Sequence, residues 1–204
     1  MSSINVLQSA PNGSVVVLAD GTYASIRKLL ATDRPQVEAL FAATSPANLY
    51  TRFFTFGTSV VERHVEHLFS TDSGMVTYVI ERAGLLLGIA DVEQEDSHTA
   101  EIAFLVADDA HGLGIGTLLL ELAADDAHER GISTFVADVL AVNHPMIEVF
   151  RDAGFDVELI NHHDDISVRM GTLRTSAATA ATAARHTSAL NRNRDAHPVD
   201  VVED

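Results

Sequence analysis

Cysteine is absent from this sequence, and lysine occurs only once, as Lys28. Without cysteine the chain cannot form a disulfide, bind zinc through thiolates or use a thiol as a nucleophile. A single lysine nearly excludes both the phosphate-binding lysine of a P-loop and a catalytic lysine in a pocket. No apolar run reaches the length of a membrane-spanning helix. These absences remove thiol, P-loop and lysine chemistry from consideration.

Basic residues are few. Lys and Arg together number 13 against 29 Asp and Glu, which gives a formal net charge of -16. That charge repels nucleic acid and anionic lipid, so we expect neither a nucleic acid nor a membrane as partner. It favours cationic partners such as protein amines, polyamines or basic small molecules. The start of the chain lacks the basic segment and apolar run of a secretory signal, so we expect a cytoplasmic protein.

A hydrophobic content of 47% in 204 residues is enough for one domain with a sizeable core. We expect residues 1–21 to be an N-terminal extension, in which residues 14–18 could form an extra strand. Hydrophobic alternation and turn residues predict further strands over residues 22–29, 75–80, 85–92, 99–106, 134–142, 157–160 and 166–170. Helical spacing and N-cap residues predict helices that start near residues 33, 45, 59, 116 and 143. Asp33 and Gln36 are spaced as a capping box for the first of them.

The end of the chain has a different composition. From Thr172 to Asp204 it consists mainly of Ala, Thr, Ser, Arg and Asn, with scarcely a large apolar residue. Such a segment buries too little apolar surface to offset the conformational entropy lost on ordering. We therefore predict a low-complexity, disordered tail over residues 172–204. A fluctuating helix over Ala177–Ala184 is the competing interpretation, because alanine favours helix.

The strongest chemical signal is a glycine-rich turn, His111–Gly116, between a predicted strand and a predicted helix. It reads His-Gly-Leu-Gly-Ile-Gly. Glycines let the backbone approach a pyrophosphate without interference from a Cβ atom. The free amides at the start of the helix and the helix dipole attract the same anion, so no lysine is needed. The turn is therefore a candidate phosphate cradle.

Two classes of phosphate-binding protein use such a turn. A dinucleotide-binding fold requires G-x-G-x-x-G or a final Ala, but Leu119 stands where close helix packing demands a small residue. Asp138 lies near the distance at which that fold places an acid on the ribose. The strand-helix-strand repeat of the fold does not continue upstream, however. The dinucleotide interpretation is therefore the less favoured one.

The turn resembles instead the pyrophosphate loop of the GNAT acyltransferases. That loop reads Gln or Arg, two residues of any kind, Gly, one residue of any kind, and Gly or Ala. Gly114 and Gly116 fit this pattern, whereas His111 departs from it at the first position. A later family motif, an Asn followed by a helix that ends in Gly-Phe, is matched between Asn143 and Phe155. Two motifs in the right order make the resemblance specific.

The resemblance covers about residues 22–171 and is closest to the acyltransferase modules of bacterial protein lysine acetyltransferases. These modules share the patterns seen here in Ser45–Phe54 and Ala100–Phe104. It implies an α/β (α+β) fold, a mixed and mostly antiparallel twisted sheet with helices on both faces. The two strands beside the loop would splay apart to admit the pantetheine arm of the cofactor. The implied reaction is transfer of an acetyl group from acetyl-CoA to a primary amine, a protein lysine or a small cationic molecule.

The resemblance also implies a set of cofactor-binding positions. The strand before the loop would bind the pantetheine arm through its backbone, the loop would bind the pyrophosphate, and an Asn and a residue on the following helix would line the arm. These positions are Phe104, Leu105 and Val106; His111, Gly112, Leu113, Gly114, Ile115, Gly116 and Thr117; and Asn143 and Phe150.

Transfer to an amine requires a base, because a protonated amine has no lone pair to attack a thioester. Glu101 is the candidate. Its neighbours Ala100 and Ile102–Phe104 are apolar, so a carboxylate in this strand lies in partly dry surroundings that raise its pKa. The same position carries the proposed base in the lysine acetyltransferases that the chain resembles. Alternatively, Glu101 lies at the exposed start of the strand and only solubilises it.

Phe150 stands where the family often has a Tyr that protonates the leaving thiolate. Phenylalanine has no proton to donate, so either water takes this role or the protein binds coenzyme A without fast turnover. A non-catalytic coenzyme A-binding module is therefore one rival to the transferase. An interaction protein that recruits a partner through its tail is the other. The sequence leaves monomer and homodimer open.

We expect no metal. His64 and His67 are three residues apart on a predicted helix and could share an ion, but Glu62 and Glu66 beside them indicate a solvated face. Tyr50, Arg52, Phe53 and Phe54 could line the acceptor entrance, with Phe53 and Phe54 as core residues in the alternative. Glu93, Glu95 and Asp96 form an acidic rim at the end of a strand, which attracts a cationic acceptor if it is more than a solvent-facing turn.

Overall fold

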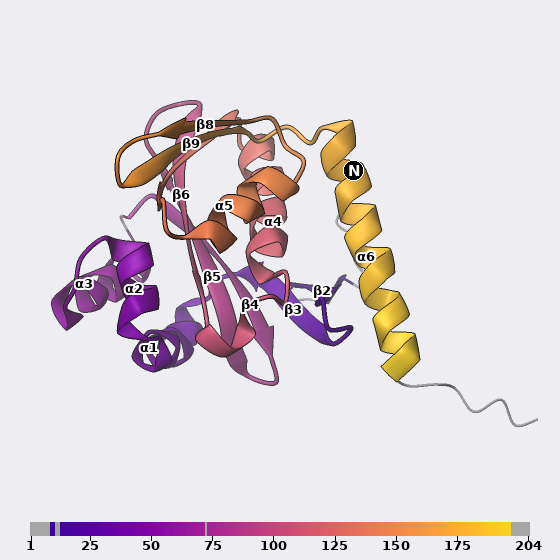
Figure 1. Ribbon diagram of the computed structural model, residues 1–204. Coiled ribbons are helices and arrows are strands. Elements are labelled where there is room, and N and C mark those ends of the chain that lie inside the picture. Colours follow the sequence, from indigo (N-terminus) through magenta and orange to yellow (C-terminus); the bar gives the residue numbers. More distant parts are fainter. Residues whose placement is uncertain (1–8, 11–12, 72, 197–204) are drawn as a thin grey trace, which may run out of the picture.

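The computed structural model of the protein describes residues 9–10, 13–71 and 73–196 (Figure 1). The strands are β1 (Ser9–Ala10), β2 (Gly13–Val17), β3 (Tyr23–Lys28), β4 (Met75–Arg82), β5 (Leu85–Gln94), β6 (Thr99–Val106), β7 (Thr134–Leu140), β8 (Val157–Asn161) and β9 (Asp165–Gly171). The helices are α1 (Arg34–Ala43), α2 (Pro46–Phe53), α3 (Thr58–Leu68), α4 (Ile115–Glu129), α5 (His144–Asp152) and α6 (Ser176–Ala196), with short 3-10 turns η1 (Ala31–Asp33) and η2 (Asp108–Ala110).

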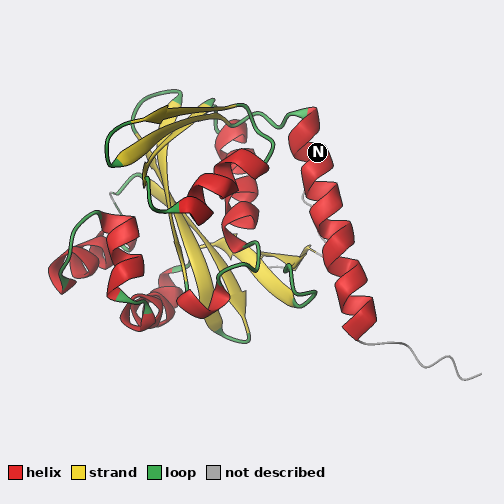
Figure 2. Ribbon diagram, in the orientation of Figure 1, coloured by secondary structure: helices red, strands yellow, loops and turns green. Residues whose placement is uncertain are grey.

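The strands form one twisted sheet in the order β1-β2-β3-β4-β5-β6-β7-β9-β8 (Figure 2). Every pair of neighbours in this sheet is antiparallel except β6 and β7, which run parallel. The mixed, mostly antiparallel sheet predicted from the sequence is therefore confirmed. The strand predicted over residues 14–18 is present as β2, which pairs with β3.

Helices cover both faces of the sheet, as predicted. On one face α4 and α5 pack into the larger core, to which α4 contributes the fully buried Leu119, Leu120 and Ala123. On the other face α1 and α3 form a second cluster, in which Val37 and Phe41 pack against β4 and β5. The central strands are thus buried on both sides, which explains their nearly continuous apolar sequences. None of the helices in the described residues is long and apolar enough to cross a membrane.

Side chains cap some of the helices, whereas α3 and α4 begin at the glycines Gly57 and Gly114 without a side-chain cap from the described residues. The Ser45 hydroxyl accepts a hydrogen bond from the backbone N–H of Asn48 at the start of α2, and Asn143 caps α5 in the same way. The capping box predicted at Asp33 is wrong. Its carboxylate instead accepts hydrogen bonds from the backbone N–H of Leu30 and from the guanidinium of Arg27, because a 3-10 turn precedes α1. A buried ion pair has replaced the cap.

The disordered tail predicted from residue 172 is wrong for residues 176–196, which form α6; residues 197–204 lie outside the described part. Small side chains let this helix approach the domain closely. A Cβ atom on Gly154 would lie 2.7 Å from the backbone nitrogen of Ala178, and one on Gly21 would lie 2.7 Å from that of Asn193. Ala178 and Ala189 are buried. The helix is therefore held by close backbone approach and not by large apolar residues.

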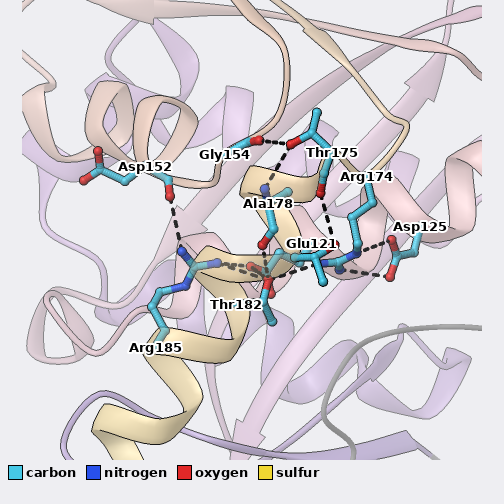
Figure 3. Close-up of polar contacts among 10 residues, drawn as sticks. Glu121, Asp125, Asp152, Gly154, Arg174, Thr175, Ala178, Thr182 and Arg185 are labelled. Carbon is cyan, nitrogen blue, oxygen red and sulfur yellow. Dashed lines mark hydrogen bonds and ion pairs between the residues drawn. The ribbon is translucent and has the colours of Figure 1, made fainter.

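Polar contacts add to the docking of α6 (Figure 3). Arg174, just before the helix, donates two hydrogen bonds of 3.0 Å to the carboxylate of Asp125 on α4. The hydroxyl of Thr182 donates to Glu121, one turn earlier on α4, at 2.7 Å. Glu121 is only 1% exposed and also pairs with Arg185. A buried carboxylate must be matched in this way, since an unpaired one would be costly.

Candidate active site

A groove opens where β6 and β7 part. The two strands pair only over Thr99–Glu101 and Thr134–Val136, after which β6 continues to Val106 without a partner on that side. This is the splay that the family resemblance implied. The resulting groove has a volume of about 690 Å³ and is bordered by α2, β6, the glycine-rich turn, β7 and α5. It is large enough for an elongated small molecule.

The glycine-rich turn lies at one side of this groove and leads into α4. Gly112 and Gly114 have φ angles of +78° and +77°, a region that residues with a side chain rarely adopt. Gly114 is the N-cap of α4, and within the described residues no side chain caps the helix there. The first amides of α4 are therefore available to an anion in the groove. The sequence-based prediction of a phosphate cradle rested on the same two features, the glycines of the turn and the free amides at the start of the helix.

His111 ties the turn to the end of β6. Its Nε2 lies 3.2 Å from the carbonyl oxygen of Val106, which also accepts a hydrogen bond of 2.8 Å from the side-chain amide of Asn48. Asn48 comes from α2, so three segments meet at this carbonyl. The residue at the first position of the loop thus holds the loop against the strand and α2.

Most of the predicted cofactor positions border the groove, namely Phe104, Val106, His111, Gly112, Gly114, Ile115, Gly116, Thr117, Asn143 and Phe150. The other two turn their side chains elsewhere. Leu105 is buried in the cluster beneath α1 and α3. Leu113 lines a separate cavity beside α6, and its carbonyl accepts a hydrogen bond from the backbone N–H of Ala19 at 3.0 Å. Leu105 and Leu113 could reach a ligand only through the backbone.

Phe150 and Asn143 hold the α5 side of the groove. Phe150 is fully buried and meets the ring of Phe104 edge to face, with 6.0 Å between ring centroids. The side-chain oxygen of Asn143 caps α5 by accepting from the backbone N–H of Met146 at 3.3 Å. Gly116 lets α4 approach α5, because a Cβ atom there would lie 3.1 Å from Val149. The contact of Phe104 with Phe150 and the close approach of Gly116 to Val149 therefore fix how α5 lies against β6 and α4.

Glu101 is the last residue of β6 that pairs with β7, so it lies where the strands begin to separate. Although the residue as a whole is exposed, partial desolvation of its carboxyl group raises its pKa. The charge of Arg52 lowers this pKa and opposes the effect, whereas the carboxylates of Glu93 and Glu95 raise it further. The carboxylate of Asp138 on β7 also raises the pKa of Glu101.

A second cavity, of about 340 Å³, lies beside Glu101. It is lined by residues of α2, α3, β5 and β6, and Arg52 and Ala103 belong to its wall and to that of the groove. Glu101 and Glu93 face each other across β5 and β6 in the wall of this cavity. The two spaces therefore meet next to the candidate base.

Sequence reasoning missed a buried cluster beneath this second cavity. Asp91 is 3% exposed and accepts hydrogen bonds from Arg52 and His64 at 3.0 Å and from Thr77 at 2.8 Å. Burial alone would raise the pKa of Asp91, but the hydrogen bond from His64 and the charge of Arg52 outweigh it and hold the pKa below its ordinary value.

The solvated face predicted for His64 is therefore wrong. Its side chain is 11% exposed, and its ring meets Phe41 and Phe53 edge to face. His67, one turn on, is 41% exposed and lies near Glu93. In the sequence, only the apolar residues of the strands that α3 covers could have indicated that one of the two histidines points inward. In the described part of the chain, no group of three or more His, Asp or Glu side chains is arranged to hold a metal ion.

Solved structures share the fold of this chain. The GNAT domain of S. lividans PAT is 28% identical, with a TM-score of 0.71 over 80% of this chain and 99% of that one. A putative acetyltransferase from Salmonella typhimurium, solved with its cofactor acetyl-CoA, has 19% identity and a TM-score of 0.60 over 75% and 96% of the two chains. Ribosomal-protein-alanine N-acetyltransferase from Brucella melitensis has 22% identity and a TM-score of 0.54 over 71% and 97%. The last two likenesses show the fold alone.

The profile of the Acetyltransferase (GNAT) family matches residues 37–155, more than half of the 204 residues. This span begins in α1 and ends just after α5. It therefore contains the splayed strands, the glycine-rich turn and the helices α2, α4 and α5. The chain therefore belongs to the GNAT acetyltransferase family, whose members transfer the acetyl group of acetyl-CoA to an amine.

Proposed function

We propose that this protein acetylates the primary amine of a cationic acceptor, either a protein lysine or a small cationic molecule, with Glu101 as the base. The observation that carries the proposal is the position of Glu101. Its carboxyl group, with a raised pKa, lies where the groove at the splayed strands meets a second, acid-lined cavity. One cavity would hold the acetyl donor and the other the acceptor. Of the three neighbouring structures above, one is named for its acceptor, a ribosomal-protein alanine, and it shows the fold alone. The choice of acceptor therefore rests on the charges of this chain.

The residues present fit acetyl-CoA. The backbone of Gly112–Thr117 and the uncapped start of α4 offer amides to the pyrophosphate. The unpaired edge of β6 over Phe104–Val106 would bind the pantetheine arm through backbone groups, and Asn143 and Phe150 would line its other side. The carbonyl of Val106 already accepts from Asn48 and His111, so Phe104 and Leu105 offer the freer backbone groups. The bound cosubstrate supplies the thioester that is the source of the acetyl group.

The acceptor cavity suits a cation. The carboxylates that act on Glu101 from the surrounding strands are those of Glu93, Glu95 and Asp138, and Arg52 is the cation that opposes them. Arg52 is itself paired with the buried Asp91, so its charge is largely compensated. The wall of the cavity itself holds three carboxylates, of Asp91, Glu93 and Glu101, against the two guanidinium groups of Arg52 and Arg63. An ammonium group that enters the cavity therefore meets a net negative charge. The formal charge of -16 for the whole chain would attract a cationic acceptor from a distance.

Glu101 would take a proton from the acceptor's ammonium group, directly or through one water, and so free the nitrogen lone pair. The nitrogen then forms a bond to the thioester carbonyl carbon, and the carbon–sulfur bond breaks. The raised pKa helps because a base works best when its pKa approaches the working pH. The sulfur leaves as a thiolate. Water would protonate it, because Phe150 has no proton to donate.

One alternative keeps a specific observation in its favour. Phe150 fills the position of the usual proton donor and is fully buried, which suits a protein that binds coenzyme A without turning over. The second alternative, recruitment of a partner by a free tail, loses its premise over residues 176–196, because α6 packs on the domain. The two remaining functions differ in whether acetyl transfer occurs.

The test combines calorimetric binding of acetyl-CoA with release of free thiol in the presence of a lysine-rich protein or a polyamine. We expect Glu101→Gln to bind acetyl-CoA like the wild type and to lower kcat by about 10²- to 10⁴-fold, the usual contribution of a general base. Glu93→Gln makes the same charge change in the same cavity, and we expect it to raise the KM of the acceptor while kcat changes little. Binding without thiol release for any acceptor in the wild type would favour the non-catalytic module. Equal effects of both variants on kcat would contradict the role of Glu101.

A further inference from the structure

The C-terminal helix α6 reaches the cofactor groove through one side chain. Arg185 lines the groove together with Asp152 at the end of α5 and with the first turn of α4. Its guanidinium pairs with the buried Glu121 and donates to the backbone carbonyl of Asp152 at 3.2 Å (Figure 3). The side chain nonetheless stays 36% exposed. A residue far outside the span of the family profile therefore forms part of the groove.

Cations are scarce in this groove. Among the described residues that line it, the Lys and Arg side chains are Arg52 and Arg185. Arg52 lies toward the second cavity and is held by Asp91. Asp152 and Glu148 also line the α5 side of the groove, so a phosphate there would meet carboxylates if Arg185 were absent. Both arginines pair with a buried carboxylate, but the side chain of Arg185 is 36% exposed against 13% for Arg52, so Arg185 is the more accessible to an anionic ligand at the α4 end.

The hydrogen bonds of Arg185 leave room for such a ligand. A guanidinium has five N–H donors, and the contacts with Glu121, Thr182 and Asp152 engage one N–H each. The fixed contacts orient the planar group, and the N–H donors that remain suit a phosphate oxygen. Glu121 lies five residues beyond Gly116 along α4, a rise of about 7.5 Å from Gly116. The guanidinium is therefore displaced from the amides that face the pyrophosphate.

We propose that Arg185 on α6 binds a phosphate group of the cofactor. Because the guanidinium is displaced along α4 from the amides that face the pyrophosphate, we assign this group to the 3′-phosphate of the ribose. Helix α6 then completes the cofactor site, and the buried Glu121–Arg185 pair positions the guanidinium. The proposal rests on the function proposed above, since it requires coenzyme A in the groove. It goes beyond that function because the glycine-rich turn and the splayed strands assign no role to α6.

The test compares the dissociation constants of coenzyme A and dephospho-coenzyme A, which lacks the 3′-phosphate, for full-length wild type and Arg185→Gln. We expect the variant to bind coenzyme A about 10- to 100-fold more weakly, the range for loss of a charge-assisted hydrogen bond. Its affinity for dephospho-coenzyme A should match that of the wild type. Equal weakening for both ligands would place the contact on the pyrophosphate instead and would still support binding of a phosphate group.

Two further variants separate binding from folding. Arg174→Gln breaks the other ion pair of the α6 region, with Asp125, but Arg174 does not line the groove. It should lower the melting temperature and leave both dissociation constants unchanged. The double variant Glu121→Gln with Arg185→Gln removes the buried charge together with its partner, so it should fold and should show the affinity loss of Arg185→Gln.

Two outcomes would overturn the proposal. The first is wild-type affinity for coenzyme A in a folded Arg185→Gln or in the double variant. The second is an equal loss of affinity in Arg174→Gln, because the effect would then come from undocking of α6. If the wild type itself bound no coenzyme A, the proposed function would fail first, which the wild-type titration shows separately.

Discussion

Gly112 allows the phosphate cradle to be tested apart from the stability of the fold. It has a φ angle of +78°, and an added Cβ atom would have no described atom within 4 Å apart from those of Gly112 itself and its two chain neighbours. Gly84, in the turn between β4 and β5, has a φ angle of +82° and equally open surroundings. Alanine at either position therefore adds the same backbone strain and no clash. Of these two glycines, only Gly112 borders the groove.

The expected magnitudes follow from these geometries. An alanine in the left-handed region costs about 1 kcal/mol, which lowers the melting temperature of a domain of this size by about 2–4 °C. Both Gly112→Ala and Gly84→Ala should show this change. Because Gly112 borders the groove, a methyl group in Gly112→Ala would come between the pyrophosphate and the backbone amides. Loss of one charge-assisted hydrogen bond weakens acetyl-CoA binding by about 10- to 100-fold.

Scanning calorimetry gives the melting temperatures, and titration calorimetry gives the dissociation constants of acetyl-CoA for the three proteins. Wild-type affinity in Gly84→Ala with a weakened Gly112→Ala would support the cradle. Wild-type affinity in Gly112→Ala would refute it, because the methyl group would then occupy space that the cofactor does not use. An equal loss of affinity in both variants would refute it too, since binding would then follow stability alone.

Two predictions concern pH. Because Glu101 must be deprotonated to accept a proton and its pKa is raised, kcat/KM of the wild type should fall as pH drops through that raised value. Persistence of the same acid limb in Glu101→Gln would assign it to another group. Asp91→Asn should lower the free energy of unfolding at pH 7 by about 3 kcal/mol in urea titrations, because the charge of Arg52 loses its buried partner. The pKa of Asp91 is lower in the folded state, so its stabilising effect is complete above the unfolded-state pKa and is lost as pH falls through the folded-state pKa. The difference in unfolding free energy between wild type and Asp91→Asn should therefore shrink below about pH 4. A difference that stays constant with pH would contradict this role of Asp91.

The parts of the site that depend on local sequence could be predicted. The bounds of β6 are those expected from the alternation of Thr99–Val106, and the turn before α4 was recognised from its glycines. A backbone cradle needs only a contiguous strand, turn and helix, so one stretch of sequence specifies it. Asn143 was likewise found from its motif, because an N-cap acts on amides a few residues away.

The parts that depend on distant segments could not be predicted. Asp91 on β5 meets Arg52 from α2 and His64 from α3 only after these helices have packed on the sheet. The spacing of His64 beside two glutamates is the same on a solvated face as on a buried one. Burial here is decided by the apolar cluster around Phe41, which the local pattern does not contain.

The prediction of a disordered tail failed because apolar surface was taken as the requirement for packing. In α6 the alanines instead remove bulk, so the helix backbone lies against Gly154 and Gly21. Two arginines then match carboxylates on α4, Arg174 with Asp125 and Arg185 with the buried Glu121. A composition rich in Ala and Arg is therefore compatible with order where the facing surface is acidic and contains glycine. Since α4 begins at the proposed phosphate cradle, the same contacts that order α6 also hold the helix whose first amides would bind the cofactor.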